Sequence, residues 1–450
     1  MKTILITAFQ AVAVKNILRT KVITSLLETD SVRIICLVRY PERVEYYKKE
    51  LPYAHTKYVA FSGIPHGVYE KIFSFLKFQT IKTRTTDLKR FAHAKDTKNY
   101  VSYWLGLCFN RLFAHRLLRR FLRFLDFHLV KNQESDNILK IYRPDIVVLT
   151  HLFDDTEISI LRSAKKRSNV KTIGFVNSWD KLTARSSIRI LPDKILVYNE
   201  ITKQEAMLHA DISEKNIDII GIPQYDQYFS EQFQTREDFC KQLGLNVSKE
   251  IILFAPIGMT YSDFDLEMID MLHAVIDEKK LIPNAQLLVR FQPNDFFDER
   301  KLEKRPWLLY DRPGLRYGSV RGGDWDMTFR DLEHLKNTLH HTSLLISYAS
   351  SLAVDAAILN KPVININFEL QKSGKFSKSP TLYYRTEHYN KALSSGGIRL
   401  VGTIEELISS SLQYLKNPLL HSSERAHLVK EQCHFTDGSS GKRMANSILN

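Results

Sequence analysis

The sequence predicts an α/β protein made of two Rossmann-like, doubly wound domains, with a basic helical insertion in the first domain. Two observations predict this fold class. Short, continuously apolar β-rich runs alternate with segments of helical spacing, which is typical of a parallel sheet covered on both faces. The alternation occurs twice along a chain of 450 residues, which is long enough for two or three domains.

The first half of the chain contains seven β-rich runs, with helical spacing between several of them. The runs cover residues 3–7, 32–38, 57–61, 145–150, 172–176, 194–198 and 217–220. Helical spacing is clear at residues 16–27 and 157–166. This succession is the βαβ pattern of a doubly wound domain, which we place at residues 1–228.

The second half of the chain repeats the scheme. Its expected strands are residues 251–254, 286–290, 344–346, 362–366 and 398–401, and its expected helices are residues 265–276, 331–339, 352–359 and 404–415. A polar stretch at residues 225–237 is the expected hinge. We therefore assign residues 229–436 to the second domain and residues 437–450 to a C-terminal helix.

A helical and strongly basic segment, the insertion, interrupts the first domain at about residues 66–135. Residues 71–131 contain fourteen Lys and Arg but three Asp, and aromatic residues are interleaved with them. This composition fits a solvated helical lid or helices that rest on an anionic membrane surface, and we favour the membrane. Charge alone also allows nucleic acid, but no nucleic-acid-binding motif accompanies it, so we do not expect that partner.

Composition excludes several other classes of protein. The four cysteines form no CxxC pair, which argues against a disulfide framework or a zinc site. Residues 3–14 are better explained as a strand and loop than as a signal peptide, because Gln10 interrupts the apolar run. No run approaches 18 apolar residues, so no transmembrane helix is expected. We expect a cytoplasmic protein without a cofactor, with peripheral attachment to the cytoplasmic face of the inner membrane as an option.

One segment of the second half combines a strand, a serine pair and a helix. Residues 344–346 are strand-like, Ser350 and Ser351 start a helix, and Asp355 lies one turn further on. Backbone N–H groups and hydroxyls at a helix start can bind a diphosphate, and an aspartate can accept hydrogen bonds from ribose hydroxyls. The alternative is that a serine simply caps the helix. The strand–helix–strand context favours a nucleotide site.

This segment resembles the donor-nucleotide region of GT-B glycosyltransferases. It resembles more closely the CDP-glycerol glycerophosphotransferase and bacterial surface-carbohydrate transferase families, whose pattern is a serine pair, an acidic residue and then Lys-Pro-Val-Ile, here residues 361–364. Phe254-Ala255-Pro256 resembles the strand, Ala-Pro and loop of these families. Arg290-Phe291-Gln292-Pro293 resembles their Arg-x-His-Pro, with Gln292 in place of the histidine.

The resemblance covers roughly residues 140–370 and includes two further motifs. Gly221-Ile222-Pro223 with Asp226 resembles an interdomain Gly-x-Pro-x-x-Asp, and residues 177–182 resemble a Ser-Trp-Asp-Asn-Leu segment. It implies an acceptor-side first domain and a nucleotide-donor second domain, with the donor in the cleft between them. The nucleotide-binding residues that it implies are Pro256, Arg290, Gln292, Ser350, Ser351 and Asp355.

Polar residues follow two expected strands of the first domain. His151 follows residues 145–150, and Asp180 follows residues 172–176. Ligands of open parallel sheets bind beyond the carboxyl ends of the strands, and an inverting transfer needs a base for the acceptor hydroxyl. Asp180 and His151 are therefore the catalytic candidates. A helix-capping Asp180 and a structural His151 are equally good explanations.

Other charged residues receive structural or electrostatic roles. Asp154, Asp155 and Glu157 are expected to cap a helix start. Arg290, at the end of a strand, could offset the charge of the leaving diphosphate in place of a metal, or it could form a structural ion pair. Residues 324–326 read Asp-Trp-Asp, but they lie in a Gly-rich segment that we interpret as a loop, so no metal site is expected.

The leading hypothesis is a glycosyltransferase that is independent of metal and, by resemblance, inverting. It would move a sugar from a nucleotide-diphosphate donor to a surface-polysaccharide or lipid-linked acceptor. One alternative is a glycerol- or ribitol-phosphate transferase that uses a CDP-linked donor, which Gln292 weakens. A second is an isomerase of the UDP-sugar 2-epimerase type. A third is a non-catalytic basic scaffold at the membrane.

Overall fold

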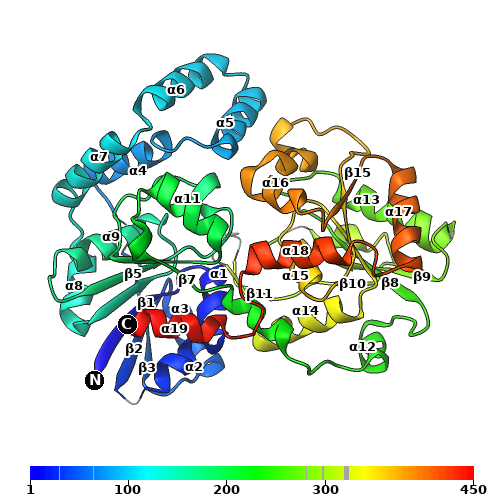
Figure 1. Ribbon diagram of the computed structural model, residues 1–450, viewed down its shortest axis with the longest axis horizontal. Helices are drawn as coiled ribbons and strands as arrows, with labels where there is room; N and C mark the ends of the chain where they lie inside the picture. Colours follow the sequence, from blue (N-terminus) through cyan, green and yellow to red (C-terminus); the bar gives the residue numbers. More distant parts are fainter. Residues whose placement is uncertain (30, 64, 280, 296–297, 319–323) are drawn as a thin grey trace. The chain divides into compact units, whose positions relative to one another are not determined.

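The chain forms two compact units, each built on its own parallel sheet (Figure 1). The computed structural model describes residues 1–29, 31–63, 65–279, 281–295, 298–318 and 324–450. Unit 1 comprises residues 1–90, 99–226 and 433–450, and unit 2 comprises residues 91–98 and 227–432. The prediction of two Rossmann-like α/β domains is confirmed.

The sheet of unit 1 has the strand order β3-β2-β1-β4-β5-β6-β7, and every neighbouring pair is parallel. Its strands are β1 (Lys2–Thr7), β2 (Val32–Val38), β3 (Thr56–Ala60), β4 (Ile146–Leu149), β5 (Lys171–Phe175), β6 (Lys194–Val197) and β7 (Ile217–Ile219). All seven expected runs form strands, with ends within one residue of those expected. Their apolar side chains are buried on both faces, as the continuous apolar pattern predicted.

Helices cover both faces of this sheet (Figure 1). They are α1 (Ala11–Ala13), α2 (Lys21–Leu27), α3 (Pro41–Glu50), α8 (Gln133–Tyr142), α9 (Asp155–Lys165), α10 (Lys181–Ala184), α11 (Glu200–Ala210) and α19 (Ser440–Leu449), with a π turn at Val14–Leu18 and 3₁₀ turns at Glu214–Asn216 and Pro223–Phe229. The C-terminal helix α19 belongs to unit 1 and packs against α2.

The insertion contains four helices, which are α4 (Val68–Gln79), α5 (Arg84–Thr97), α6 (Tyr100–Phe113) and α7 (Arg116–Leu129). Figure 1 shows α4, α6 and α7 as a helical layer beyond α9 and α11. Helix α4 packs against both α6 and α7. Among the described residues, no helix combines the length and the apolar character that crossing a membrane requires.

The sheet of unit 2 has the order β10-β9-β8-β13-β14-β15, again with parallel neighbours. Its strands are β8 (Glu250–Ala255), β9 (Ala285–Arg290), β10 (Tyr310–Asp311), β13 (Leu344–Ser347), β14 (Val363–Ile366) and β15 (Arg399–Val401). Its helices are α12 (Arg236–Leu243), α13 (Asp265–His273), α14 (Phe329–His341), α15 (Leu352–Ile358), α16 (Glu387–Ser394), α17 (Ile404–Lys416) and α18 (Ser422–Cys433), with a π turn at Ala274–Glu278 and 3₁₀ turns at Glu299–Leu302, Phe376–Lys378 and Pro380–Arg385.

One expected loop is wrong. Within the Asp-Trp-Asp sequence, Trp325 and Asp326 form strand β12 (Trp325–Asp326), which pairs antiparallel with β11 (Leu315–Arg316). Both residues are buried, and Asp326 accepts a hydrogen bond from the backbone N–H of Met327. The polar and glycine-rich sequence around these residues is typical of a loop. A strand pair of two residues each leaves no periodic pattern that would indicate it. A buried carboxylate in this setting has a structural role.

Each sheet has a point where the order of strands reverses. In unit 1 this switch point lies between β1 and β4, and in unit 2 it lies between β8 and β13. Strand connections leave such a point in opposite directions, so the loops that follow its two strands diverge and leave room for a ligand beyond their carboxyl ends. In each unit, functional residues are therefore expected at the carboxyl ends of the two strands that flank the switch point.

Candidate functional site

The switch point of unit 2 carries three of the residues expected to bind a nucleotide. Pro256 directly follows β8, and Ser350 and Ser351 follow β13, whose Ser347 is paired with Ala255 of β8. Pro256 is buried, Ser350 is half-buried and Ser351 is exposed. These residues are far apart in sequence, but they follow the carboxyl ends of two adjacent strands of one sheet.

One serine of the pair caps the start of α15 and the other does not. Ser350 Oγ accepts a hydrogen bond of 3.2 Å from the N–H of Leu352, the first residue of α15. Ser351 occupies the N-cap position but makes no side-chain cap hydrogen bond. The capping explanation therefore applies to Ser350 and leaves Ser351 without a capping role.

Asp355 lies in α15 and bonds to a residue that sequence reasoning missed. The Tyr228 hydroxyl donates a 2.5 Å hydrogen bond to Asp355 Oδ1, and both residues are buried. Burial raises the pKa of Tyr228 well above its usual value, and the nearby Asp355 raises it further, so the phenol keeps its proton and remains the donor. Asp355 thus ties α15 to Tyr228 within unit 2.

Arg290, at the end of β9, is a buried cation. It forms an ion pair with Asp311 of β10, and His334 lies 3.1 Å from the same carboxylate. Burial lowers the pKa of Arg290 to about 10, while Tyr228, Asp331 and Asp355 act in the opposite direction. The guanidinium therefore remains charged at neutral pH. Of the two roles expected for Arg290, the structure contains the structural ion pair.

Gln292 connects the segments that follow β8 and β9. Its Nε2 donates to the carbonyl oxygens of Ile257, at 2.6 Å, and Pro256, at 3.4 Å. Gly258 in the same loop has φ +92°, where an L side chain would be strained, and its N–H donates to Asp265. Burial raises the pKa of Asp265 to about 7. Gln292 thus fixes the backbone beside Pro256.

In unit 1, the structure brings together His151 and a lysine from the segment after β5. Lys181 Nζ lies 2.9 Å from Nε2 of His151, and both side chains are buried. Burial, followed by the charges of Lys181 and Arg185, lowers the pKa of His151 well below 6.5. Burial also lowers the pKa of Lys181 to about 8, partly offset by Asp180. His151 is therefore neutral and Lys181 mostly charged at pH 7.

Asp180, the other catalytic candidate, is half-buried and not a cap. Its Oδ1 accepts a 2.6 Å hydrogen bond from the Ser178 hydroxyl. It occupies the N-cap position of α10 but makes no side-chain cap hydrogen bond. Burial lowers the pKa values of Lys181 and Lys89, and the negative charge of Asp180 offsets part of this lowering. Lys89 Nζ donates to the carbonyl of Ala184. A carboxylate thus lies among cations at the carboxyl end of β5.

The expectation of three capping acids before α9 is correct for Asp154 alone. Asp154 accepts from the N–H groups of Thr156 and Glu157. Asp155 instead pairs with Lys77 and Arg189, and Glu157 accepts hydrogen bonds from Thr7, Thr150 and the His151 N–H. These two side chains bond to residues outside α9 instead. All three acids lie near the start of the helix in sequence, so the sequence could not show that their side chains have different partners.

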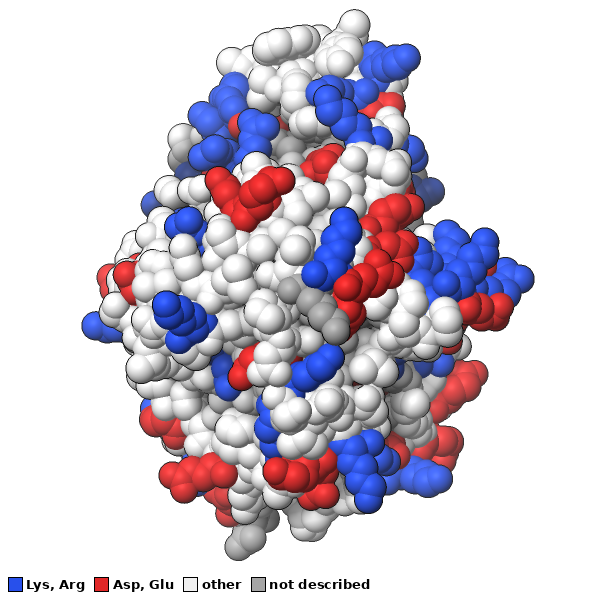
Figure 2. Space-filling model, turned by 90° about the vertical axis from the view of Figure 1, so that its right-hand side faces the viewer, with Lys and Arg blue, Asp and Glu red and all other residues white. Residues whose placement is uncertain are grey.

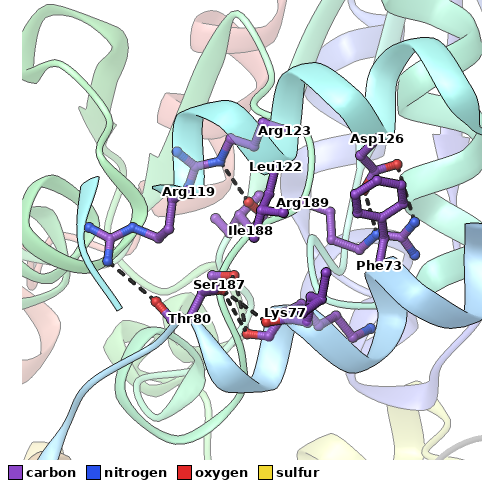
Figure 3. A pocket seen from close by; sticks show the side chains of 11 residues that line it. Phe73, Lys77, Thr80, Arg119, Leu122, Arg123, Asp126, Ser187, Ile188 and Arg189 are labelled. Atoms are coloured by element: carbon purple, nitrogen blue, oxygen red, sulfur yellow. Dashed lines mark hydrogen bonds and ion pairs between the residues drawn. The ribbon is translucent and has the colours of Figure 1, made fainter. Parts of the chain in front are cut away.

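A buried ionic cluster holds the insertion on the rest of unit 1 (Figure 3). Arg189 pairs with Glu70 of α4 and Asp126 of α7, and Arg162 of α9 also pairs with Asp126. The adjoining cavity has a volume of about 20 Å³, enough for about one water molecule. The cavity is therefore too small for a nucleotide or sugar, and we assign the cluster a structural role.

Comparisons with known proteins agree with this architecture. Residues 168–300 match the family model of CDP-Glycerol:Poly(glycerophosphate) glycerophosphotransferase. The matched part contains the motifs around Asp180, Asp226, Pro256 and Arg290, but not the serine pair. A search of curated proteins gives no match.

Solved structures show the same fold over the whole chain. UDP-GlcNAc 2-epimerase from Neisseria meningitidis, bound to UDP-GlcNAc, has 12% identity and a TM-score of 0.56, with 100% of both chains covered. A glycosyltransferase from Rickettsia africae ESF-5 has 14% identity and a TM-score of 0.52, covering 100% of this chain and 99% of that one. The Methanocaldococcus jannaschii epimerase with UDP-GlcNAc and UDP gives the same identity, score and coverage. The chain thus has the two-domain α/β fold of GT-B glycosyltransferases and these epimerases.

Proposed function

We propose that the chain is a glycosyltransferase that moves a sugar from a nucleotide-diphosphate donor to a saccharide or lipid-linked acceptor of the cell envelope. One observation carries the proposal. Pro256, Ser350 and Ser351, which the sequence motifs assigned to the donor, follow the two strands at the switch point of unit 2. The UDP-GlcNAc and UDP in two structures of the same fold support a nucleotide ligand.

Unit 2 supplies the donor residues in this proposal. Ser350 and Ser351 contribute hydroxyls for the diphosphate, and Gln292 holds the loop at Pro256. Arg290, charged at neutral pH, offsets the negative charge that grows on the leaving diphosphate, without a metal. Asp355 positions α15 through its hydrogen bond with Tyr228, and its negative charge acts on Arg290.

Unit 1 supplies the acceptor residues. Asp180 is the proposed base that takes the proton of the attacking hydroxyl, because its carboxylate is half-buried at the carboxyl end of β5 and interacts electrostatically with Lys181 and Lys89. An attack from the side opposite the leaving group would invert the configuration of the sugar.

A CDP-linked glycerol- or ribitol-phosphate transfer is the second candidate, because residues 168–300 match the glycerophosphotransferase family model. Gln292 stands where the sequence motif of that family has histidine, which disfavours a mechanism that needs an imidazole. An epimerase reaction on a UDP-sugar is the third, because epimerases share the fold.

One assay separates these reactions by their products. The purified protein is incubated with UDP-, GDP-, dTDP- and CDP-sugars and with CDP-glycerol, with and without a membrane extract as acceptor. Acceptor-dependent release of a nucleoside diphosphate supports sugar transfer. Release of CMP supports polyol-phosphate transfer, and an altered sugar without acceptor supports epimerisation. No turnover together with lipid binding supports a scaffold.

We also propose that the insertion rests on an anionic membrane. More than half of the large apolar side chains that the structure describes as exposed lie between residues 68 and 129. In α7 the usual orientation of an amphipathic helix is reversed. Arg119, Arg123 and Asp126 face the protein, where the two arginines pair with Asp211.

The opposite face of α7 is apolar and exposed. Leu117, Phe121 and Phe124, spaced four and three residues apart, are 73%, 56% and 59% exposed. Trp104 and Leu105 of α6 are also exposed, and basic residues such as Arg116 and Arg120 lie among them. Figure 2 shows a largely uncharged surface flanked by Lys and Arg at the top of the view, where α6 lies. Aromatic side chains ringed by cations fit the interface of an anionic bilayer.

A further inference from the structure

The segments after β4 and β5 of unit 1 contain buried polar atoms that the described residues do not satisfy. The Nδ2 and Oδ1 atoms of Asn177 and Nδ1 of His151 are buried without a hydrogen-bond partner in the described part of the chain. Asn177 is 2% exposed and His151 is 7% exposed. Buried polar groups are unfavourable when left unpaired, so their presence at one edge of the sheet points to a ligand.

The two residues follow neighbouring strands. Leu149 of β4 is paired with Gly174 of β5, and His151 and Asn177 lie two and three residues beyond this pair. Strand β4 also flanks the switch point of unit 1. The unsatisfied atoms therefore lie where an open parallel sheet binds its ligands.

Lys181 determines which nitrogen of His151 carries the proton. An ammonium group has only donors, so Lys181 Nζ donates to Nε2 across the 2.9 Å contact. A neutral imidazole that accepts at Nε2 has its proton on Nδ1. The low pKa of His151 and the pKa of about 8 of Lys181 agree with this arrangement at pH 7. The unsatisfied Nδ1 is then a donor and not a base.

The remaining charged groups around the pair fix its position. Glu157 accepts the backbone N–H of His151 at 2.9 Å, and its charge acts on Lys181. Asp180, Arg185 and Lys89 are the other charged groups that act on Lys181. The imidazole ring is thus held from its backbone and from Nε2, which leaves Nδ1 as the atom that can meet a ligand.

The free atoms identify the chemical class of ligand. The Nδ1–H of His151 and Nδ2 of Asn177 donate, whereas Oδ1 of Asn177 accepts. A phosphate offers acceptors only and would leave Oδ1 unsatisfied. A hydroxyl both donates and accepts, so neighbouring hydroxyls of a sugar or polyol satisfy all three atoms.

We propose that Lys181 is a positioning residue that holds His151 as the Nδ1-protonated tautomer, and that His151 and Asn177 bind hydroxyl groups of an uncharged sugar or polyol. The inference rests on the proposed function, since this ligand is the acceptor, and it leaves Asp180 as the base. It assigns His151 a hydrogen-bonding role in place of the catalytic role expected from sequence.

The tautomer is tested by ¹⁵N NMR of the full-length protein labelled at histidine. The His151 signals are identified by their loss in His151→Gln. We expect a protonated Nδ1 and an unprotonated Nε2 at pH 7, a change in this pattern in Lys181→Met, and its retention in Lys181→Arg. Lys49→Met, at an exposed lysine of unit 1, is the control. A protonated Nε2 in the unsubstituted protein, or an unchanged pattern in Lys181→Met, overturns the proposal.

The ligand class is tested on the same signals with glycerol, methyl β-glucoside and inorganic phosphate. At least one hydroxylated probe should shift the Nδ1 signal, and Asn177→Ala should weaken its binding about tenfold. A shift with phosphate alone, or with no probe, overturns the proposal. Neither the tautomer nor the ligand-induced shift of the His151 signals depends on a nucleotide. If the proposed function is wrong, this shows separately, because unit 2 then binds no nucleotide.

Discussion

The carboxylate of Asp226 accepts hydrogen bonds from the backbone N–H groups of Ser440, at 2.9 Å, and Gly441, at 2.8 Å. It caps the first turn of α19 from a position 214 residues earlier in the chain. Gly221, with φ +80°, lies so close that a Cβ atom there would come within 2.4 Å of Ser440 Oγ. The Gly-x-Pro-x-x-Asp motif and the Ser440-Gly441 start of α19 therefore form one structural contact in unit 1.

Replacing Asp226 should destabilise unit 1. Asp226→Ala leaves two buried N–H groups of α19 without an acceptor, and we expect a loss of about 1–2 kcal/mol in the free energy of unfolding, measured by urea denaturation. Asp437→Ala is the matched control. Its carboxylate pairs with Arg443 at the surface, so its loss should cost under about 1 kcal/mol. Equal losses in the two variants would show that Asp226 is not a cap.

The ionic cluster at the insertion should be sensitive to the loss of one cation. Arg189→Met leaves Glu70, Asp126 and Asp155 with fewer positive partners, and unpaired buried charge should cost about 3 kcal/mol or more. Lys49→Met, at an exposed lysine of the same unit, is the control. If both variants unfold at the same urea concentration as the unsubstituted protein, the cluster does not hold the insertion.

Glu157 should make the stability of unit 1 depend on pH. Burial raises the pKa of its carboxyl to about 7, above its ordinary value of 4.5. Because the folded protein holds the proton of Glu157 more tightly than the unfolded chain does, the protonated carboxyl stabilises the fold. This stabilisation is complete below about pH 4.5 and is lost as the pH rises through 7.

The neutral variant Glu157→Gln should remove this dependence. Its stability relative to the unsubstituted protein should rise by about 2–3 kcal/mol between pH 5 and pH 8, measured by urea unfolding at intervals of one pH unit. Glu214→Gln, at an exposed carboxyl of unit 1, should show no such rise. A constant difference for Glu157→Gln across this range would contradict the assigned pKa.

The exposed residues of the insertion should bind vesicles. We expect the protein to sediment with vesicles containing phosphatidylglycerol at low salt, less so at high salt, and not with pure phosphatidylcholine. Trp104→Ser combined with Phe121→Ser should reduce sedimentation severalfold. The control is Leu400→Ser combined with Leu419→Ser, two exposed residues of unit 2. Equal vesicle binding by the two double variants would contradict the proposal that the insertion contacts the membrane.

Much of the fold could be predicted from the sequence, because buried parallel strands leave a local signature. All twelve expected strands form, with ends within one residue. The two-residue strands β10, β11 and β12 were missed, because two residues carry no periodicity. The attachment of α19 to unit 1 was also hidden, since it depends on the distant Asp226.

The candidate site was predictable where a motif fixed its place along a strand. Pro256 and the serine pair follow strand ends, and Arg290 is the last residue of a strand, as expected. Their partners were not predictable, because hydrogen bonds such as Tyr228 to Asp355 and Lys181 to His151 join residues across the fold. Lys181 gave no signal of burial, because residues 177–185 read Asn-Ser-Trp-Asp-Lys-Leu-Thr-Ala-Arg, a mixed polar and apolar segment.

The central claim, that unit 2 binds a nucleoside diphosphate at its switch point, is tested most directly by thermal shift with UDP, GDP, CDP, dTDP and CMP. The variant Ser351→Glu puts an anion at an exposed position of the site, and Ser409→Glu is the exposed control. We predict that one nucleoside diphosphate raises the Tm of the unsubstituted protein and of Ser409→Glu, but not of Ser351→Glu. No shift with any of these nucleotides, or an equal shift in Ser351→Glu, would contradict the claim.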